Sequence, residues 1–281
     1  MSSIKDRQRA AARARLEKEM AERSAAARKR KQRNAIIGSA IGVVIVVVAA
    51  GLIVTKLNHD DKKKTTASGS GTAAGTVACT WTPADPSTGA QIKDTGGTPP
   101  LNVPNTGKDT MTLATNLGNI VAAVDRTKAP CTAAAFEYLS AKKFWDNTKC
   151  HRLTTEGIKV LQCGDPTATG KGYPKTAGAG GPNFMYPEEN LPAGKDPTYP
   201  AGTIAMAKTQ DPGTTSSQFF IVYADIPASA LPAQYTVLGT VTSGLDIVQK
   251  VAKAGTDNAN QPGDGHPKLE IDIKSLTMAA A

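Results

Sequence analysis

The chain has 281 residues, of which 40% are hydrophobic, 20% are charged and 5% are aromatic. This length suits one ordinary domain with appendages or two small domains, and the hydrophobic content excludes a wholly disordered chain. The formal net charge is +9, but the first 33 residues hold 12 of the 33 cationic side chains and four of the 24 acidic ones, which leaves +1 for the rest. A nearly neutral body does not favour a nucleic-acid partner.

The chain begins with a basic tail, residues 1–34, whose Ala, Glu, Arg and Lys content is typical of helix. The next segment, residues 35–55, contains an uncharged run of 20 residues from Ala35 to Val54. At about 1.5 Å of rise per residue, a helix of this length spans the hydrocarbon layer of about 30 Å. Because the cationic residues precede the run, we expect a single-pass helix with a cytoplasmic N-terminus and the remainder of the chain outside.

A cleaved signal peptide is the alternative for this segment, with Ala49-Ala50-Gly51 as a possible cleavage site. We favour an uncleaved anchor because both the apolar run and the basic region are longer than a signal peptide needs. We interpret the tail as a segment that sets topology, with contact to anionic lipid or to a cytoplasmic partner as the alternative.

Residues 56–107 change to Thr, Gly, Ser, Ala and Pro, and the run at 65–76 has the composition of a flexible linker. The stretch 82–107 holds too many Pro and Gly residues to predict regular structure, although Cys79 and Trp81 indicate that part of the segment docks. We therefore expect a tether that ends where the globular body, 108–278, begins.

The globular body alternates short apolar stretches with turns. Helices are predicted at 129–144, with Pro130 near the start, and at 244–255, ending at Gly255. Strand patterns occupy 111–127 and 150–165 as strand–turn–strand units, and 202–209, 216–224, 235–241 and 269–278 as single strands. This arrangement predicts a mainly β fold, a closed antiparallel eight-stranded barrel capped by two helices.

Several ordered motifs resemble one family. The stretch 150–165 contains His-Arg-Leu and then Leu-Gln-Cys-Gly-Asp-Pro, and the stretch 202–221 contains Ala-Met-Ala and Ser-Gln-Phe-Phe-Ile. They are similar to the two signatures of the cyclophilins, and the resemblance covers about 108–278. The resemblance implies a cyclophilin-like barrel with peptidyl-prolyl cis-trans isomerase activity, in a membrane-anchored form similar to those of high-GC Gram-positive bacteria.

The implied reaction rotates an Xaa–Pro peptide bond and breaks no covalent bond, so it requires no nucleophile, metal or cofactor. Its barrier, about 18–20 kcal/mol, comes from amide resonance. An apolar pocket must hold the proline ring, and a fixed donor must contact the prolyl nitrogen as its lone pair localises. Interactions that are stronger in this twisted state accelerate the rotation.

The resemblance assigns roles to individual residues. Arg152 matches the catalytic arginine of the family, whose guanidinium is always charged, and Gln162 matches the glutamine that orients it. The implied substrate-binding residues are Met206, Phe220 and Leu231 in the proline pocket, Gln218 in the groove, Ala207 and Lys208 through their backbone, and Tyr235 where the family usually has a His.

The chain also departs from the family. The segment before Gln162 is longer than in the best-known members, so Ile158 or Val160 would replace the pocket's Phe-Met pair. Ala230 stands where many members have a Trp that contributes to cyclosporin binding, and we therefore expect weak cyclosporin affinity.

Other polar residues receive structural interpretations. His151 would face away from its neighbour Arg152 on a strand, and we expect a packed structural side chain. The pair Glu188-Glu189 is interpreted as a solvated surface rather than an acid–base pair.

On the expected topology the four cysteines lie outside the membrane, where oxidation is permitted, and they allow three pairings. Our preferred hypothesis pairs Cys150 with Cys163 across a strand–turn–strand unit. Cys79 would then bridge to Cys131 and tie the docked part of the linker to the first helix. The sequence contains no CxxC motif for redox chemistry or zinc.

The sequence thus predicts a monomeric, membrane-tethered, extracytoplasmic isomerase that acts on Pro-containing segments of secreted or cell-wall proteins. The alternative is a catalytically weak cyclophilin-like module that binds such segments as a chaperone or adaptor, which Ala230 and Tyr235 motivate. A third hypothesis is a scaffold in which the basic tail links a cytoplasmic partner to the wall. A hydrolase is excluded because no Ser–His–Asp or Cys–His set stands in a recognisable context.

Overall fold

The computed structural model describes residues 75–281, apart from residues 175 and 194–195. The predicted basic tail (1–34), the predicted membrane segment (35–55) and the first part of the predicted linker lie outside the described residues. Within the described ranges, no helix is both long and apolar enough to cross a bilayer.

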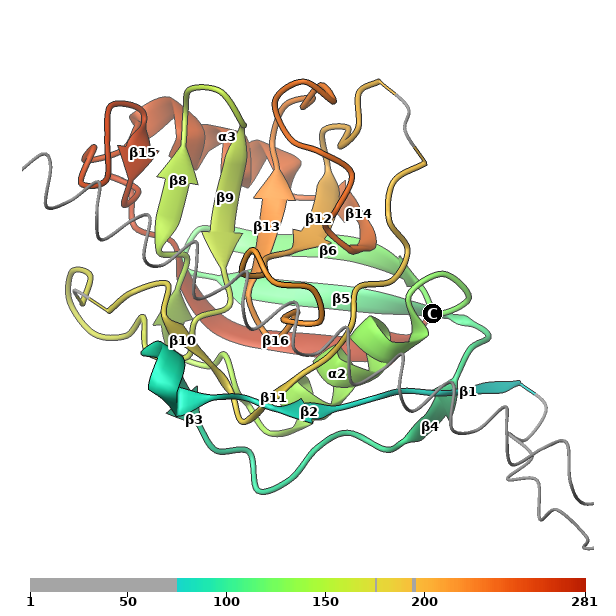
Figure 1. Cartoon of the computed structure of the whole chain (residues 1–281). Coiled ribbons are helices and arrows are strands. Elements are labelled where there is room, and N and C mark those ends of the chain that lie inside the picture. Colours follow the sequence, from blue (N-terminus) through green and yellow to red (C-terminus); the bar gives the residue numbers. More distant parts are fainter. Residues whose placement is uncertain (1–74, 175, 194–195) are drawn as a thin grey trace, which may run out of the picture. The chain divides into compact units, whose positions relative to one another are not determined.

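One large antiparallel sheet forms the body of this part of the chain (Figure 1). The order of hydrogen-bonded strands is β15-β8-β9-β13-β12-β14-β6-β5-β16-β7. Their bounds are β5 (Lys108–Thr115), β6 (Gly118–Asp125), β7 (Thr148–Lys149), β8 (Arg152–Thr154), β9 (Val160–Cys163), β12 (Thr203–Met206), β13 (Phe219–Val222), β14 (Val237–Ser243), β15 (Asp264–Gly265) and β16 (Asp272–Ala280). Each segment that the sequence predicts as strand contributes to this sheet, which confirms the mainly β class.

The sheet differs from the predicted closed barrel of eight strands. Its order contains ten strands and has two ends, β15 and β7, so the sheet is open. Only Cys150 and His151 separate the end strand β7 from β8, which is the second strand from the other end. The Cys150 N–H donates to Ile271 O at 3.1 Å and the His151 N–H donates to Gln162 O at 3.0 Å. This two-residue link therefore contacts both sides of the opening.

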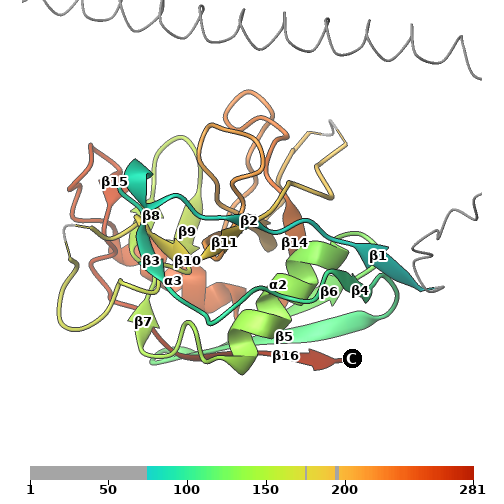
Figure 2. The same cartoon turned by 60° about the horizontal axis from the view of Figure 1, so that its bottom comes forward.

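Two α-helices of the described chain, α2 (Pro130–Ala141) and α3 (Leu245–Ala254), lie at opposite ends of the curved sheet, as Figures 1 and 2 show. Pro130 stands in the first turn of α2, where its missing N–H is not needed. α2 ends earlier than predicted, and Lys143 then adopts a positive φ of 53° as the chain turns. α3 lies between Gly244 and Gly255, which have φ angles of 86° and 82°. Both predicted helices are confirmed.

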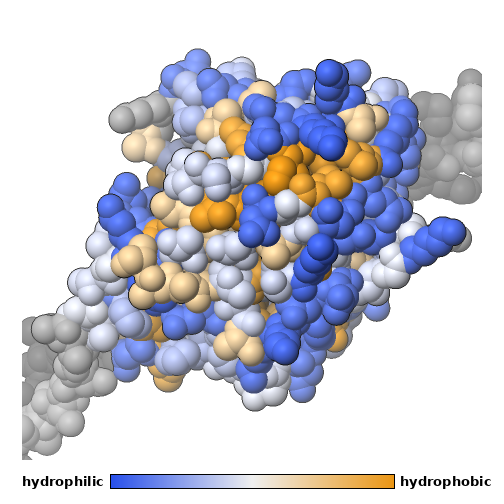
Figure 3. All heavy atoms as spheres, turned by 180° about the vertical axis from the view of Figure 1, so that it is seen from behind, coloured by the Kyte–Doolittle hydropathy of each residue, from blue (hydrophilic) through white to orange (hydrophobic). Residues whose placement is uncertain are grey.

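The main core lies between the curved sheet and both helices, with Val248 and Val251 contributed by α3. Phe136 of α2 packs against Trp145 and Phe219, with ring centroids 4.9 Å and 5.7 Å apart. Half-buried apolar side chains such as Leu117 and Ile247 extend the core towards the surface. Figure 3 shows the face opposite to that of Figure 1, where apolar side chains gather in one patch between hydrophilic ones.

Residues 75–107, which we name the N-terminal extension, run across α2 and the later strands β10 and β11 (Figure 2). Their short strands pair as β1 (Thr76–Ala78) with β4 (Asn102–Pro104), β2 (Thr82–Pro83) with β11 (Phe184–Met185), and β3 (Gln91–Lys93) with β10 (Gly180–Pro182). The prediction that 82–107 lacks regular structure is therefore wrong for these segments. Pro and Gly are tolerated because each short strand pairs along one edge only.

Aromatic packing and a disulfide hold the extension in place. Cys79 is bonded to Cys131 at the start of α2. The Trp81 ring packs edge-on against Phe184 and Tyr186, with centroids 5.5 Å and 5.4 Å away. The extension is thus joined covalently to one helix and packed against β11 and the residue that follows it.

A further disulfide joins Cys150, next to β8, to Cys163 at the end of β9. Both of these cysteines are fully buried. The structure therefore contains both disulfides of the preferred hypothesis.

Candidate active site

Adjacent strands align the side chains of the candidate site. Arg152 on β8 lies opposite Gln162 on β9, and Gln162 lies opposite Phe220 on β13. Residues directly opposite each other in antiparallel strands share a face of the sheet, so these three side chains form a row. Their neighbours Leu161 and Phe219 face the main core. The row therefore lies on the face of the sheet that is turned away from this core.

A cavity of about 150 Å³, which we name the slot, lies beside this row. Phe220 packs edge-on against Tyr235 and Tyr199, with ring centroids 5.8 Å and 6.3 Å away. The slot is lined by Arg152, Ile158, Val160, Gln162, Ala207, Lys208, Phe220, Leu231 and Tyr235. A small cavity that combines apolar side chains such as Phe220 and Leu231 with the guanidinium of Arg152 suits a small apolar ring next to a polar group.

Arg152 is fixed by a carboxylate from the end strand β15. Its Nε donates to Asp264 Oδ1 at 2.8 Å and its Nη2 donates to Asp264 Oδ2 at 2.6 Å, which is a bidentate ion pair. The Asp264 side chain is 9% exposed, whereas the Arg152 side chain is 38% exposed. The hydrogen bonds between them lower the pKa of Asp264 and raise the pKa of Arg152. Both groups are therefore charged at neutral pH.

Two glutamines continue this set of contacts. Arg152 Nη1 donates to Gln162 Oε1 at 3.4 Å, and Gln162 Nε2 donates to Gln218 Oε1 at 2.9 Å. Gln218 Nε2 in turn donates to the carbonyl oxygens of Gly178 and Gly180 at 2.9 Å and 2.8 Å. The two backbone carbonyls thus fix Gln218, Gln218 fixes Gln162, and Gln162 keeps Nη1 of Arg152 at the edge of the slot.

The family model of the "Cyclophilin type peptidyl-prolyl cis-trans isomerase/CLD" matches residues 110–278. This chain belongs to the cyclophilin family. The match covers the large sheet and both helices of the described chain, and begins after the N-terminal extension.

Curated relatives include the "Probable peptidyl-prolyl cis-trans isomerase B" of Mycobacterium leprae, which is 43% identical over 177 residues, 59% of this chain and 55% of that protein. The protein of the same name from Mycobacterium tuberculosis H37Rv is 40% identical over 197 residues, 64% of this chain and 59% of that protein. The chain thus spans between half and two thirds of the length of these relatives.

A solved structure has a similar fold. The cyclophilin type peptidyl-prolyl cis-trans isomerase of Cryptosporidium parvum, crystallised in the presence of the dipeptide Ala-Pro, gives a TM-score of 0.50 at 26% identity. The similarity covers 61% of this chain and 99% of that structure.

Most of the residues predicted for the site of this cyclophilin lie together. The slot is lined by the predicted residues Arg152, Gln162, Ala207, Lys208, Phe220, Leu231 and Tyr235, and both Ile158 and Val160 lie where the Phe-Met pair was expected. Gln218 lines the neighbouring cavity and contacts Gln162.

Met206 differs from the expectation. Met206 is fully buried in the main core, because it points away from the face that its strand neighbour Ala205 shares with the slot. The Ala207 N–H donates to Gln218 O at 2.9 Å, so the pairing predicted for the backbone of Ala207 would use its carbonyl oxygen. The structure therefore does not bring Met206 to the slot.

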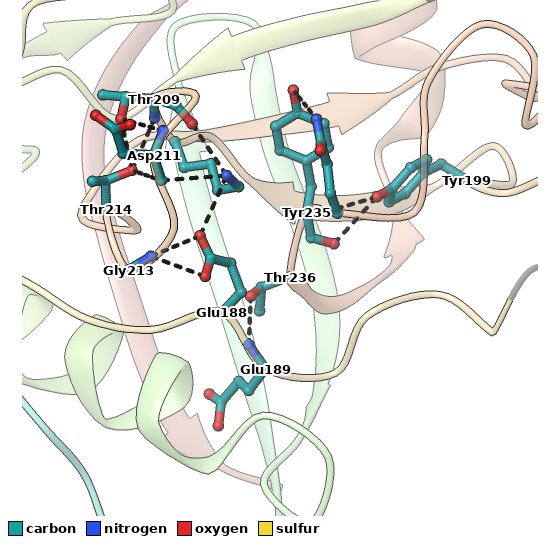
Figure 4. Close-up of polar contacts among 11 residues, drawn as sticks. Glu188, Glu189, Tyr199, Thr209, Asp211, Gly213, Thr214, Tyr235 and Thr236 are labelled. Atoms are coloured by element: carbon teal, nitrogen blue, oxygen red, sulfur yellow. Dashed lines mark hydrogen bonds and ion pairs between the residues drawn. The ribbon is translucent and has the colours of Figure 1, made fainter. Parts of the chain in front are cut away.

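The pair Glu188-Glu189 is not the solvated surface that the sequence suggested. Glu188 lies 3.4 Å from Lys208 Nζ, with side chains 13% and 7% exposed, and accepts the Gly213 N–H at 3.1 Å (Figure 4). Lys208 Nζ also donates to Thr209 O at 3.2 Å and to Asp211 O at 3.4 Å. Glu188 and Lys208 thus hold the 208–214 loop, which lies between the slot and the neighbouring cavity.

Glu189 contacts helix α2 rather than the 208–214 loop. Its carboxylate accepts the Thr132 N–H at 2.6 Å and the Thr132 hydroxyl at 2.7 Å, in the first turn of α2. Its own N–H donates to the Thr236 hydroxyl at 2.9 Å (Figure 4). Burial raises the pKa of Glu189, and the hydrogen bonds from Thr132 oppose this change. The residue therefore acts as an N-terminal cap supplied from outside the helix.

His151 is 3% exposed, as expected for a packed residue. Burial lowers its pKa to about 4, so the imidazole is neutral at pH 7. Among the described residues, no group of three or more His, Cys, Asp or Glu side chains is arranged to hold a metal ion.

Asp264 was missed from the sequence. It lies in a Gly-rich turn far from Arg152, and nothing in its local pattern distinguishes it from a surface carboxylate. The pairing of β15 with β8 brings the two residues together.

Proposed function

We propose that this cyclophilin is a peptidyl-prolyl cis-trans isomerase that accelerates rotation about Xaa–Pro bonds in polypeptide clients. The proposal is carried by one observation, the guanidinium of Arg152 held between Asp264 and Gln162 at the edge of the slot. The names of the mycobacterial relatives and the Ala-Pro dipeptide in the Cryptosporidium parvum structure support the same reaction and ligand.

The geometry suits rotation of an amide. As the Xaa–Pro bond twists, resonance is lost and the lone pair localises on the prolyl nitrogen, which then accepts a hydrogen bond. Phe220 and Leu231 supply apolar surface for the proline ring, and Arg152 Nη1 supplies the donor. Because Asp264 and Gln162 already fix the guanidinium, little reorganisation is needed when the twisted state forms.

The proposal includes the location of the clients. An anchor at 35–55 with the isomerase domain outside the cytoplasm would bring the site to secreted or cell-wall proteins. The uncharged run in the sequence supports the anchor, and two disulfides among the described residues support an oxidising compartment.

The test compares the full-length chain with Arg152→Ala and Arg152→Lys on a short Ala-Ala-Pro peptide. We expect kcat/KM to fall about tenfold or more in Arg152→Ala, a loss of about 1.4 kcal/mol of transition-state stabilisation. Arg152→Lys should give an intermediate rate, because an ammonium group keeps the charge but cannot form the bidentate pair with Asp264.

Circular dichroism and thermal unfolding show whether each variant is folded. An unchanged rate in folded Arg152→Ala would contradict the role of Arg152. A folded wild-type chain without any acceleration would contradict the isomerase and favour the module that only binds Pro-containing segments.

A further inference from the structure

A second cavity adjoins the slot of this cyclophilin. Its volume is about 430 Å³, compared with about 150 Å³ for the slot. The two cavities share Gln162, Ala207 and Lys208 in their linings. An extended peptide with its proline in the slot would therefore bring a nearby residue to the second cavity.

One wall of the second cavity comes from the N-terminal extension. The contributing residues are Ala84, Asp85, Gly89, Ala90 and Ile92. They all precede residue 110, where the match to the family model begins. The extension thus adds a wall that the matched part of the domain does not contain.

Backbone pairing sets the distance between this wall and the rest of the cavity. β3 runs parallel to β10, with Gln91 beside Gly180 and Ile92 beside Gly181. The Gln91 N–H donates to Ala179 O at 2.9 Å, and the Ala84 N–H donates to Asn183 O at 3.1 Å. These bonds fix the wall beside β10, which continues the lining of the cavity.

Side-chain contacts fix the chain both before and after the residues that form the wall. Before it, Cys79 is bonded to Cys131 and Trp81 Nε1 donates to Pro100 O at 3.1 Å. After it, the buried Thr95 donates from its hydroxyl to Asn183 Oδ1 at 2.6 Å. The wall is therefore pre-organised before a client binds, which lowers the entropic cost of binding.

The lining indicates which side chains the cavity accepts. Small residues, mainly Ala, Gly and Pro, leave the space open, and Ile92 and Met185 add apolar surface. The charge of Lys208 is compensated by Glu188. The lining also contains polar residues, among them Asp85, Asp211 and Gln218, but apolar surface predominates, and a cavity of this size and lining suits a large apolar side chain.

We infer that the N-terminal extension forms one wall of the client-binding groove and makes the second cavity a subsite for a bulky apolar side chain close to the target proline. This inference rests on the proposed isomerase function. The extension is then a specificity element, and Ile92 is the residue of the extension that contributes most to it.

The test uses the full-length chain and a series of Ala-rich peptides with one proline. A single residue near the proline is Gly, Phe or Lys, and it is moved through the positions on either side. We expect kcat/KM to be about tenfold higher for Phe than for Gly at one of these positions. Ile92→Ala should reduce this Phe-to-Gly ratio about fivefold, because it removes apolar surface from the wall.

Two further variants separate this effect from a change in folding. A Cβ at Gly181 would lie 3.5 Å from Ser216 Oγ, an ordinary contact, so Gly181→Leu fills the cavity from the neighbouring strand β10 and should also abolish the Phe preference. Gln91→Ala is the matched control, since the exposed Gln91 precedes Ile92 on β3 and does not line the cavity. It should leave the ratio unchanged.

Binding of the same peptides, measured by fluorescence anisotropy, separates this inference from the proposed function. Tighter binding of the Phe peptide without turnover would contradict the isomerase and support the subsite. Equal turnover of the Gly and Phe peptides, a preference for Lys, or a Phe preference that survives both Ile92→Ala and Gly181→Leu would overturn the subsite.

Discussion

Arg152 depends on a carboxylate 112 positions further along the chain. A surface arginine normally samples many rotamers, and fixing it costs side-chain entropy. Here the bidentate pair with Asp264 fixes it before a client arrives, and Asn260 Nδ2 donates to Asp264 Oδ1 at 3.0 Å to hold the carboxylate in turn. Asp264 is therefore a positioning residue for the proposed reaction.

Asp264→Asn tests this role at the scale of one residue. The amide keeps the size of the side chain but loses the charge and one of the two acceptors, so Arg152 is no longer fixed in one orientation. We expect kcat to fall about tenfold while KM changes little, because the apolar side chains that are proposed to hold the proline ring are unaltered. Peptide-isomerisation kinetics measure the split between kcat and KM.

Asp246→Asn is the matched control for this variant, because Asp246 is an exposed carboxylate on α3 outside the slot and the second cavity. It should behave as the wild type. A rise in KM with unchanged kcat for Asp264→Asn would show that the residue acts on binding rather than on the orientation of Arg152.

The residues of the slot could be predicted where they belong to contiguous motifs. Arg152, Gln162 and Phe220 lie in two short stretches, and the pairing of β8, β9 and β13 then brings them side by side. Met206 belongs to the same motifs but faces the core, because motif similarity does not state on which side of a strand a residue points. Asp264 was unpredictable because its role depends on a long-range pairing.

At the scale of elements, the N-terminal extension is the segment whose structure differs most from what its composition predicts. Pro and Gly make a segment unfavourable for strands when it is considered by itself, and the sequence therefore predicts a tether. The strands β2 and β3 form because β11 and β10, about 90 to 100 residues later, offer them edges to pair with. Local composition contains no information on such partners.

The disulfide between Cys79 and Cys131 should contribute strongly to stability. It closes a loop of 52 residues, for which chain entropy gives a stabilisation of about 4 kcal/mol. We expect the variant with Cys79→Ser and Cys131→Ser to unfold at lower urea concentration, with a higher m-value because its unfolded chain is less compact. Equilibrium urea unfolding monitored by tryptophan fluorescence measures both quantities.

The pair Cys150 and Cys163 provides a comparison, since its shorter loop gives about 3 kcal/mol by the same argument. Equal midpoints for the wild type and the Cys79→Ser, Cys131→Ser variant would contradict the contribution of the longer loop. It would also show that backbone pairing suffices to hold the extension.

For the molecule as a whole, the order of strands and helices agreed with the alternation of apolar and polar residues, because most of these elements bury one face in a common core. The opening in the sheet was not predictable in this way. It lies at the irregular link of Cys150 and His151, where the Cys150 N–H donates to Ile271 O, just before β16, and the His151 N–H donates to Gln162 O on β9.

The same link makes global stability sensitive to acid. The pKa of His151 falls from 6.5 to about 4 through burial, so between these pH values the unfolded chain binds a proton that the folded chain does not. Folding stability should therefore decrease as the pH falls from 6.5 to 4, by about 3 kcal/mol in total from this residue. Urea unfolding at pH 7 and pH 4 measures the decrease.

His151→Leu removes the titrating group and should make the dependence on pH shallower by this amount. The carboxylates with lowered pKa values, such as Asp264 and Asp125, titrate in both proteins and cancel in the comparison. Parallel pH curves for the wild type and His151→Leu would exclude His151 as a source of acid sensitivity.

The covalent bond between Cys79 and Cys131 has a mechanical consequence. Tension applied from the N-terminal side passes at Cys79 through the sulfur atoms into α2 and bypasses residues 80–130. The bypassed stretch includes the wall of the second cavity and the β5–β6 hairpin. In a single-molecule pulling experiment, this stretch would contribute about 180 Å of extra contour length only after reduction. Until the disulfide is reduced, the wall of the second cavity therefore bears no tension. Binding or release of a client at the proposed subsite would then not depend on force applied to the N-terminal side of the chain.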